Sequence, residues 1–522
     1  TNPVALVTLS DLRDAHINWQ LFNFEGKNKT LTKEPREPRG YQRPIIKKAL
    51  DYYKLHDRGK LIMAPGTGKT FTSLQIAEGL MKQQHKSIYH VLYLVPSIQL
   101  LSQTLRNWNN DADTSLDMES FSVVSDAKAS KNSEDLSAQD IGFPATTDVE
   151  KLLENYKKIN FNKNKKNFVV VLSTYQSIDK VSQAQKHGCP EFDLIVADEA
   201  HRTTGSSEIG DPSVFTEVHD NKIVKAEKRL YQTATPKIYG QNAKRKAVEQ
   251  SIEIASMDDE SIYGKEIARL TFGQAVNCGA LTDYKVSVLA IDEHYIHKNM
   301  QGIMKNTDSE LDTNDIGKII GVWNAMVKRN GITGEITGAP MKRAIAFSDR
   351  IVHSKQITRE FNTVINEYLG DNAKDSFSVD VRHVDGSMDA MKKKEEIDWL
   401  AGDVPENQAH ILSNVQFLTE GIDVPNLDAV IFFSPKKSQI DIVQAVGRIM
   451  RQFEGKEYGY IILPIVVDAQ SDPAKVLDDN KKYKEVWQVL NALRSVDERF
   501  EATINHLQLN KKKPDRIGLN NI

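Results

Sequence analysis

Short apolar runs recur along most of the chain, with stretches of mixed polarity between them. Runs of about four to eight residues that are rich in Val and Ile are typical of strands buried on both faces of a parallel sheet. About ten or more residues separate such runs here, enough for a crossover helix, so the pattern predicts a βαβ architecture. We expect strands at residues 91–95, 168–172, 194–197, 344–347, 429–433 and 460–467.

Two sheets of this kind fit into the chain, and residues 278–283, Cys-Gly-Ala-Leu-Thr-Asp, are typical of a connection between them. The fold class that we predict is therefore α/β, with one parallel-sheet lobe over residues 39–280 and a second over residues 281–467. Residues 1–38 are polar and irregular, which indicates a linker segment. Towards the end, apolar side chains recur at helical spacing, so we expect residues 468–522 to form a helical segment outside the second sheet.

The composition is that of an ordinary soluble globular protein. The 522 residues are 40% apolar and 27% charged. No apolar stretch approaches the roughly 18 residues that a membrane-spanning helix needs. Cys189 and Cys278 form no CxxC pair, so we expect structural thiols in a reducing cytoplasm rather than a zinc site or a disulfide framework. The chain begins Thr-Asn-Pro without a signal peptide, which predicts a fragment of a longer cytoplasmic chain.

Residues 63–70, Met-Ala-Pro-Gly-Thr-Gly-Lys-Thr, lie between an apolar pair and an amphipathic run. A strand, a glycine-rich turn and a helix in this order form a phosphate cradle, because backbone N–H groups and the positive end of the helix face the anion. Lys69 is expected to contact the β- and γ-phosphates of ATP, and the hydroxyl of Thr70 to bind Mg²⁺. The nucleotide-binding residues that this loop predicts are Gly66, Thr67, Gly68, Lys69 and Thr70.

Residues 192–201, Phe-Asp-Leu-Ile-Val-Ala-Asp-Glu-Ala-His, read as a buried strand that ends in two adjacent carboxylates. Mg²⁺ prefers oxygen ligands and keeps several waters, so Asp198 can hold it directly or through water. Glu199 can then orient and deprotonate the water that attacks the γ-phosphate. A solvated Asp-Glu turn is the alternative, and the phosphate loop upstream on the same chain favours the catalytic interpretation.

Residues 438–441 resemble a capping box, which predicts a helix on which Gln444, Arg448 and Arg451 follow at positions i, i+4 and i+7. One glutamine and two arginines then share a single face. A guanidinium fork suits the charge of a γ-phosphate, and an arginine finger raises the rate of hydrolysis by roughly 10³ to 10⁵. The alternative is a pair of surface arginines on a solvated helix.

With these three elements in order, the chain resembles a superfamily 2 helicase of the Asp-Glu-Ala-His type, from about residue 39 to residue 467. The resemblance implies two RecA-like lobes that bind ATP and Mg²⁺. It also implies that residues 233–236, Thr-Ala-Thr-Pro, couple hydrolysis to lobe movement. We expect His201 to link the hydrolytic site to the second lobe, and the alternative is a purely local hydrogen bond. The further nucleotide contacts that it implies are Gln42, for the adenine, together with Gly421, Asp423 and Gln444.

The net charge of −3 means that any DNA contact is local rather than a property of the whole surface. We expect this contact to be made by backbone N–H groups and small hydroxyls at strand ends. The lysines at 163, 165 and 166 are expected to belong to a solvated loop, and Trp108 to the core. By resemblance to the strand-tracking motifs of both lobes, the DNA contacts are Ser97, Gln99, Thr174 and Thr419.

Three further segments, residues 145–148, 198–203 and 477–490, are similar to the motor of single-polypeptide (type ISP) restriction-modification enzymes, which are related to type I restriction motor subunits. This resemblance implies translocation along double-stranded DNA. It also implies nuclease, methyltransferase and target-recognition domains in a longer chain, with residues 468–522 as the start of a helical coupler. The present sequence contains no nuclease or methyltransferase signature, so we expect it neither to cleave nor to methylate DNA.

Three functions remain open at this point. The first is a translocase that moves along duplex DNA without parting the strands. The second is a strand-separating helicase on DNA or RNA, which shares every motif of the two lobes. The third is a nucleotide-dependent clamp that binds and releases without net movement.

Overall fold

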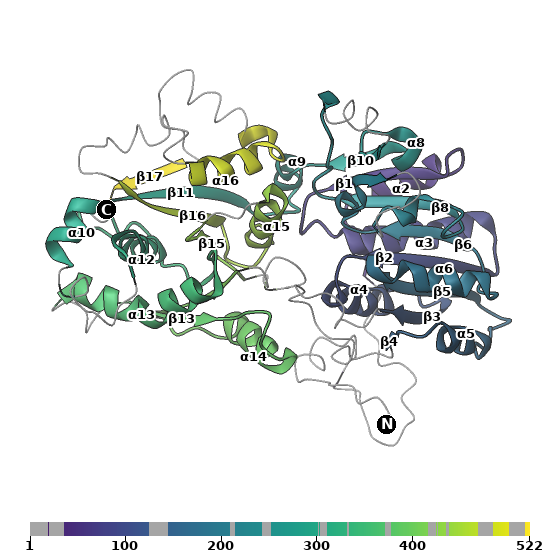
Figure 1. The fold of residues 1–522 in the computed structure, drawn as a ribbon, viewed down its shortest axis with the longest axis horizontal. Coiled ribbons are helices and arrows are strands. Elements are labelled where there is room, and N and C mark those ends of the chain that lie inside the picture. Colours follow the sequence, from purple (N-terminus) through teal and green to yellow (C-terminus); the bar gives the residue numbers. More distant parts are fainter. Residues whose placement is uncertain are drawn as a thin grey trace. The chain divides into compact units, whose positions relative to one another are not determined.

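The computed structural model of the chain divides into two compact units, Thr1–Leu270 and Thr271–Ile522 (Figure 1). Each unit contains its own parallel sheet with helices around it. Among the described residues, none of the helices has the length and apolar character that crossing a membrane requires. The structure describes residues 19, 36–124, 145–208, 215–242, 252–300, 302, 311–330, 333–370, 377–415, 424, 426–434, 438–467, 484–500 and 517–521.

The sheet of the first unit consists of eight described strands. They are β1 (Arg58–Met63), β2 (Ile88–Val95), β3 (Leu116–Val123), β4 (Ala145–Thr146), β5 (Lys166–Thr174), β6 (Phe192–Ala197), β8 (Ala226–Thr233) and β10 (Lys265–Leu270). Their order is β10-β1-β8-β6-β2-β5-β3-β4, and every pairing is parallel. The predicted strands at 91–95, 168–172 and 194–197 are confirmed as parts of β2, β5 and β6. All three runs are buried, as both faces of a parallel sheet require.

Helices of the first unit follow the strands as crossovers (Figure 1). The α4 helix is capped by the side chain of Ser97, which accepts a hydrogen bond from the Leu100 N–H, and α5 is capped in the same way by Asp148. A separate antiparallel pair is formed by β7 (Gly205–Glu208) and β9 (Ile252–Ala255). The helices are α2 (Gln42–Tyr52), α3 (Lys69–Gln84), α4 (Ile98–Asp111), α5 (Val149–Lys157), α6 (Ile178–Lys186) and α8 (Glu260–Tyr263), with 3₁₀ turns at Tyr175–Ser177, Ala200–Thr203 and Glu217–His219.

The second unit has a parallel sheet of seven described strands. They are β11 (Asp283–Asp292), β12 (Arg343–Phe347), β13 (Ser378–His383), β14 (Gln408–Asn414), β15 (Ala429–Phe432), β16 (Tyr458–Val467) and β17 (Ile517–Asn521), in the order β13-β14-β12-β15-β16-β11-β17. The predicted strands at 344–347, 429–433 and 460–467 are confirmed as β12, β15 and β16. The β17 strand, which pairs with β11, lies in the segment for which only helices were expected.

Helices also pack against the second sheet and enclose its core, which includes Ile316, Phe361 and Ile411. The α16 helix packs on α15 and buries Val486 and Leu490, so the helical periodicity near the end of the chain is confirmed where the structure describes it. The helices are α9 (Phe272–Asn277), α10 (Glu293–Asn299), α12 (Thr313–Met326), α13 (Ile351–Leu369), α14 (Ala390–Ala401), α15 (Gln439–Ile449) and α16 (Lys484–Arg494).

The segment after α16 is tied to the start of β11 by a buried polar cluster. The carboxylate of Asp497 is fully buried and accepts hydrogen bonds from the Tyr284 hydroxyl, at 3.1 Å, and from Arg499 Nη2, at 2.9 Å. Arg499 Nη2 also lies 3.3 Å from a carboxylate oxygen of Asp283. The predicted connection at residues 278–283 therefore leads into a strand whose first residues are held by the end of the described helical segment.

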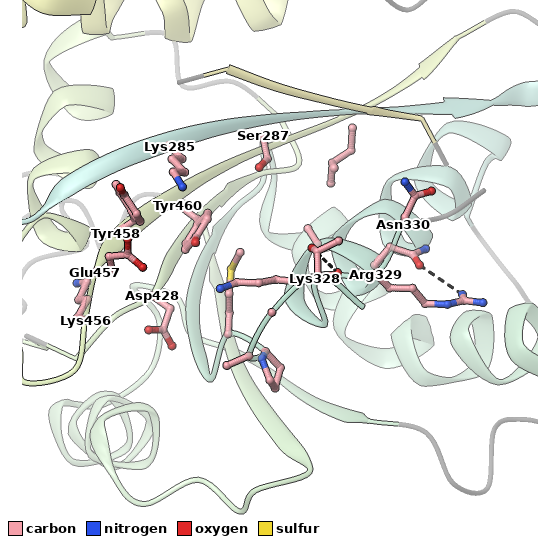
Figure 2. Close-up of a pocket in the computed structure, with 18 of the residues that line it drawn as sticks. Lys285, Ser287, Lys328, Arg329, Asn330, Asp428, Lys456, Glu457, Tyr458 and Tyr460 are labelled. Atoms are coloured by element: carbon pink, nitrogen blue, oxygen red, sulfur yellow. Dashed lines mark hydrogen bonds between the residues drawn. The ribbon is translucent and has the colours of Figure 1, made fainter. Parts of the chain in front are cut away.

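A pocket of about 650 Å³ opens where β11 and β16 begin (Figure 2). Basic, acidic and aromatic side chains mix in its wall. The amine of Lys285 lies 3.8 Å from the centre of the Tyr458 ring, and that of Lys328 lies 4.9 Å from the centre of the Tyr460 ring. None of the residues predicted to bind nucleotide or DNA lines this pocket. It is therefore distinct from the candidate site described next.

Candidate nucleotide-binding site

The candidate residues of the first unit lie at the carboxyl ends of neighbouring strands. The phosphate loop follows β1, Thr233 ends β8, and Asp198 follows β6. These three strands are adjacent in the sheet and parallel to one another. Ligands of open parallel sheets bind beyond the carboxyl ends of the strands. The strand order therefore brings together three motifs that are far apart in the sequence.

The phosphate loop has the predicted order of strand, turn and helix. Gly66 and Gly68 both adopt left-handed backbone conformations, with φ of 81° and 82°, which glycine reaches without steric cost. Helix α3 begins at Lys69, directly after the turn. The buried Thr67 hydroxyl donates to the Ala64 carbonyl oxygen, at 2.6 Å, and so braces the turn from within. This geometry suits a phosphate group, because the free N–H groups of the first helical turn lie beside it.

Gln42 lies behind the phosphate loop and is fully buried. Its amide nitrogen lies 3.1 Å from the Thr72 hydroxyl and 3.4 Å from the Thr67 carbonyl oxygen, and its amide oxygen accepts from the Arg39 N–H. A Cβ at Gly68 would lie 2.8 Å from the Gln42 amide nitrogen, so a larger residue there would displace the Gln42 side chain in addition to straining the backbone at φ 82°. Gln42 thus supports the loop, and its contact with adenine stays a prediction.

Lys69, Asp198 and Glu199 meet at this edge of the sheet. The Lys69 amine lies 3.9 Å from one carboxylate oxygen of Glu199. Glu199 itself has φ of 47°, a conformation that is rare outside glycine and concentrated at functional sites. Its other oxygen, Oε2, is buried and forms no hydrogen bond among the described residues, although His201 Nδ1 lies 3.4 Å away. A buried, unsatisfied carboxylate oxygen beside a phosphate loop is well suited to accept a proton from water.

The electrostatics of this cluster favour a cation. Burial and the neighbouring charge of Glu199 raise the pKa of Asp198, while Lys69 opposes the shift. When both carboxylates are ionised, the pair exceeds the charge of Lys69, and a cation would stabilise this ionised state. Mg²⁺ needs only one or two protein oxygens and completes its shell with water and phosphate. Asp198, with the hydroxyl of Thr70 in the first turn of α3, fits that requirement.

His201 connects the carboxylates to the motif at residues 233–236. Its Nδ1 lies 2.9 Å from the Thr233 hydroxyl and 3.4 Å from Glu199 Oε2. Burial lowers the pKa of His201 to about 4, so the ring is neutral near pH 7. The Thr233 hydroxyl also accepts a hydrogen bond from the Thr235 N–H, at 3.2 Å. A change at Glu199 can therefore reach residues 233–236 through one side chain.

Two aromatic residues beside this cluster were not predicted as part of the site. The Tyr93 hydroxyl lies 3.3 Å from Asp198 Oδ2, and the Trp108 indole N–H donates to the Thr70 carbonyl oxygen at 3.0 Å. Both side chains are fully buried, which confirms that Trp108 belongs to the core. The sequence offers one signal for such residues, since a buried tyrosine or tryptophan needs a partner for its polar atom.

The candidate DNA contacts follow the next two strands of the sheet. The β2 and β5 strands pair so that Val95 lies opposite Thr174, and Ser97 follows shortly after β2. The Ser97 hydroxyl caps α4, while the Thr174 hydroxyl is buried and lies 2.9 Å from the Ser177 hydroxyl. Gln99 lies in the first turn of α4. Thr419, Gly421 and Asp423 lie outside the described residues.

The arginine motif belongs to the second unit. Ser438 caps α15 as predicted, accepting a hydrogen bond from the Asp441 N–H, and Gln444 and Arg448 lie on that helix. The helix ends at Ile449, so Arg451 does not share a helical face with them and lies in the bend that follows. This corrects the expected i+7 position, although Arg451 stays close to the motif through its N–H, 3.4 Å from the Arg448 carbonyl oxygen.

Comparison with protein families matches both units. Residues 36–238 match the family described as type III restriction enzyme, res subunit, and residues 328–452 match the helicase conserved C-terminal domain. The first match contains the phosphate loop and the Asp198–Glu199 pair. The second contains Gln444, Arg448 and Arg451.

Solved structures and curated proteins include longer relatives. The chain is 51% identical to LlaBIII, described as an ATP-dependent type ISP restriction-modification enzyme bound to DNA, over 98% of this chain and 33% of that one, with a TM-score of 0.85. It is 45% identical to a nuclease-deletion mutant of the type ISP enzyme LlaGI in complex with a DNA substrate mimic, over 92% of this chain and 30% of that one, with a TM-score of 0.63. It is also 26% identical to the probable helicase A859L of African swine fever virus, over 90% of this chain and 45% of the viral protein.

The chain thus spans about a third of the solved relatives and less than half of the viral one. The matches confirm the predicted fold of two tandem RecA-like lobes. The chain thus contains regions that match a type III restriction enzyme res subunit and a helicase C-terminal domain, and over nearly its whole length it is similar to part of the type ISP restriction-modification enzymes LlaBIII and LlaGI.

Proposed function

We propose that this chain is an ATP-hydrolysing motor that moves along double-stranded DNA without parting its strands. The main support for ATP hydrolysis is the cluster of Lys69, Asp198 and Glu199 beside the phosphate loop. In this cluster the Oε2 atom of Glu199 forms no hydrogen bond to the described residues. The similarity to type ISP enzymes, of which the LlaBIII structure is described as bound to DNA, supports duplex DNA as the track.

In the proposed hydrolysis of ATP, the residues of this cluster have separate roles. The N–H groups of the turn and of the first α3 turn bind the phosphates, and Lys69 leaves its contact with Glu199 to pair with them. Bound Mg²⁺, held by Asp198 and Thr70, would neutralise phosphate charge. Glu199 Oε2 then accepts a proton from the attacking water.

Completion of the site requires the second unit. Gln444, Arg448 and Arg451 belong to a different unit from Lys69, so the proposal requires both units to act on one nucleotide. DNA that contacts both units is expected to favour that state, and hydrolysis should therefore depend on DNA. The candidate contacts remain Ser97, Gln99 and Thr174 in the first unit and Thr419 in the second.

The proposed partners lie in a longer protein. Because the chain spans about a third of the type ISP enzymes that it matches, we propose that a nuclease, a methyltransferase and a target-recognition domain accompany it. The described part of the segment after residue 468 would then begin a coupler to those domains. The motor itself would make no base-specific contact, because contacts to the DNA backbone carry no sequence information.

One set of assays tests the proposal and its alternatives. ATPase activity is measured with duplex DNA, single-stranded DNA and RNA, alongside triplex displacement and strand separation, with Lys69→Ala as the inactive control. Triplex displacement without strand separation is the expected result. Strand separation would select a helicase, the alternative that the similarity to the probable helicase A859L favours. DNA-stimulated ATPase without either movement would select a nucleotide-dependent clamp.

A further inference from the structure

Helix α4 joins two regions of the first unit that the proposed function requires to act together. It begins at Ile98, directly after the candidate DNA contact Ser97, and its last turn contains Trp108. The helix packs against α3, whose first turn contains Thr70, a candidate Mg²⁺ ligand. One rigid helix thus reaches from the candidate DNA contacts to the phosphate loop.

The contact between the two helices is directional. The Trp108 indole N–H donates to the Thr70 carbonyl oxygen at 3.0 Å, and the Ser73 hydroxyl donates to the same oxygen at 2.9 Å. The indole has one donor and no acceptor, so a rotation of its ring breaks this bond rather than exchanging it. A shift of α4 therefore acts on the backbone of Thr70, and through it on the hydroxyl that the proposed function assigns to Mg²⁺.

A second contact links the Trp108 indole, through the ring of Tyr93, to the carboxylate of Asp198. The rings of Trp108 and Tyr93 meet edge to face, with centroids 5.0 Å apart and an angle of 80°. The Tyr93 hydroxyl lies 3.3 Å from Asp198 Oδ2 and accepts from the Gln232 amide at 2.6 Å. Both aromatic side chains are fully buried, and close-packed interiors transmit displacement. The pair therefore contacts both residues that are candidates for holding Mg²⁺.

We propose that Trp108 and Tyr93 are positioning residues that couple DNA binding at the start of α4 to the geometry of Thr70 and Asp198. This inference rests on the proposed function, because it requires the chain to bind both nucleotide and DNA. Neither aromatic residue needs to touch nucleotide or DNA. By linkage, DNA that favours the aligned geometry raises the affinity for Mg²⁺ and nucleotide, and Mg²⁺–nucleotide raises the affinity for DNA by the same factor.

The test compares Trp108→Phe with Trp323→Phe in the full chain. Trp323 is a matched control, because it is also buried and its indole N–H also donates to a backbone carbonyl oxygen at 3.0 Å, that of Phe377 in the second unit. Each substitution keeps an aromatic ring and removes one indole bond. The measurement is the MgCl₂ concentration that half-saturates equilibrium binding of a fluorescent ADP analogue, with and without duplex DNA, so no turnover enters the readout.

In the wild type and in Trp323→Phe, DNA is expected to lower this concentration by about fivefold or more, the lower end of usual coupling between sites. In Trp108→Phe the DNA effect is expected to disappear. Tyr93→Phe is the second variant, and it is the one to use if Trp108→Phe does not fold. It keeps the ring and loses the bond to Asp198, so it is expected to raise the half-saturating concentration and to reduce the DNA effect.

The outcomes separate this inference from the proposed function. A DNA effect in Trp108→Phe equal to that in the wild type overturns the positioning role, while DNA-stimulated hydrolysis in the wild type leaves the proposed function standing. Equal loss of the DNA effect in Trp108→Phe and Trp323→Phe also overturns it, since a general loss of packing would then be the cause. Wild type that neither binds duplex DNA nor responds to it overturns the proposed function itself.

Discussion

Replacing Glu199 by glutamine is expected to stop ATP hydrolysis and to leave nucleotide binding in place. Glutamine has the same size, so it fits the space in which Glu199 Oε2 is buried. The backbone at this position has φ of 47°, and glutamine meets the same strain as glutamate, so the fold of the turn should not change. The substitution therefore removes the negative charge and the proton-accepting oxygen, and little else.

The size of the effect follows from the surroundings of this carboxylate. A positioned general base contributes about 10²- to 10⁴-fold to a rate, or ~3–5 kcal/mol of activation free energy. Binding should change much less, because Glu199 touches the phosphate loop only through Lys69 at 3.9 Å. Its charge also raises the pKa of Asp198, so neutralising it makes Asp198 easier to ionise. We expect nucleotide affinity to change by less than about tenfold, which corresponds to roughly 1.4 kcal/mol.

Two measurements check this prediction. Phosphate release with saturating duplex DNA gives the turnover, and equilibrium binding of a fluorescent nucleotide gives the affinity. Lys69→Ala is the contrasting variant, because it loses a charge-assisted contact of about 1.5–3 kcal/mol and should weaken binding by about ten- to 150-fold. Turnover in Glu199→Gln within about threefold of the wild type would refute the reasoning, since a general base is worth far more than that.

Three further predictions address the second unit, the DNA path and pH. Arg451→Ala should lose most of the DNA stimulation of ATPase activity and keep nucleotide binding to the first unit; full stimulation, measured as phosphate release with and without duplex DNA, would contradict its role. Ser97→Asp should abolish DNA-stimulated hydrolysis with ADP binding intact, because a carboxylate at the start of α4 repels phosphate. Alanine at residues 163, 165 and 166 is its control; of these, Lys166 is the first residue of β5 rather than part of the expected loop, and an effect of those changes alone would move the DNA path to the segment that leads into β5. Burial raises the pKa of Glu78 from 4.5 to about 7, so its ionisation costs stability as pH rises through this window. Glu78→Gln should then raise the free energy of unfolding by up to roughly 3 kcal/mol near pH 8 and by little near pH 4, as measured by urea denaturation; a gain of the same size at both pH values would refute the assignment.

The strands that the sequence predicted are those whose residues are buried on both sides. In β5, for example, eight of the nine residues of Lys166–Thr174 are buried, so a continuous apolar run marks it without any knowledge of its neighbours. The β17 strand, Ile-Gly-Leu-Asn-Asn, has no such run, and it becomes a strand by pairing with β11. Its formation depends on a tertiary contact with β11, which the local pattern of apolar and polar residues does not reveal.

The candidate site likewise contains some residues that the sequence could predict and others that it could not. Lys69, Asp198 and Glu199 could be predicted because adjacent residues form recognisable motifs at the ends of predicted strands. The bond from Trp108 to Thr70 spans 38 positions and ends on a backbone carbonyl, which has no signature in the sequence. Arg451 shows a different limit: helical spacing predicted a shared face, but periodicity does not reveal that the helix ends at Ile449.

The order of strands in the first unit explains why a coupling residue should lie on β2. Along the carboxyl edge, β1, β8 and β6 lead to the nucleotide candidates, and β2 and β5 lead to the DNA candidates. The β2 strand lies between β6 and β5, and Tyr93 pairs across to Val196, two residues before Asp198. A side chain at this position can contact the carboxylates, while the next helix, α4, starts at the DNA candidates. The boundary between the nucleotide candidates and the DNA candidates therefore falls on β2, where Tyr93 contacts Asp198 and Trp108.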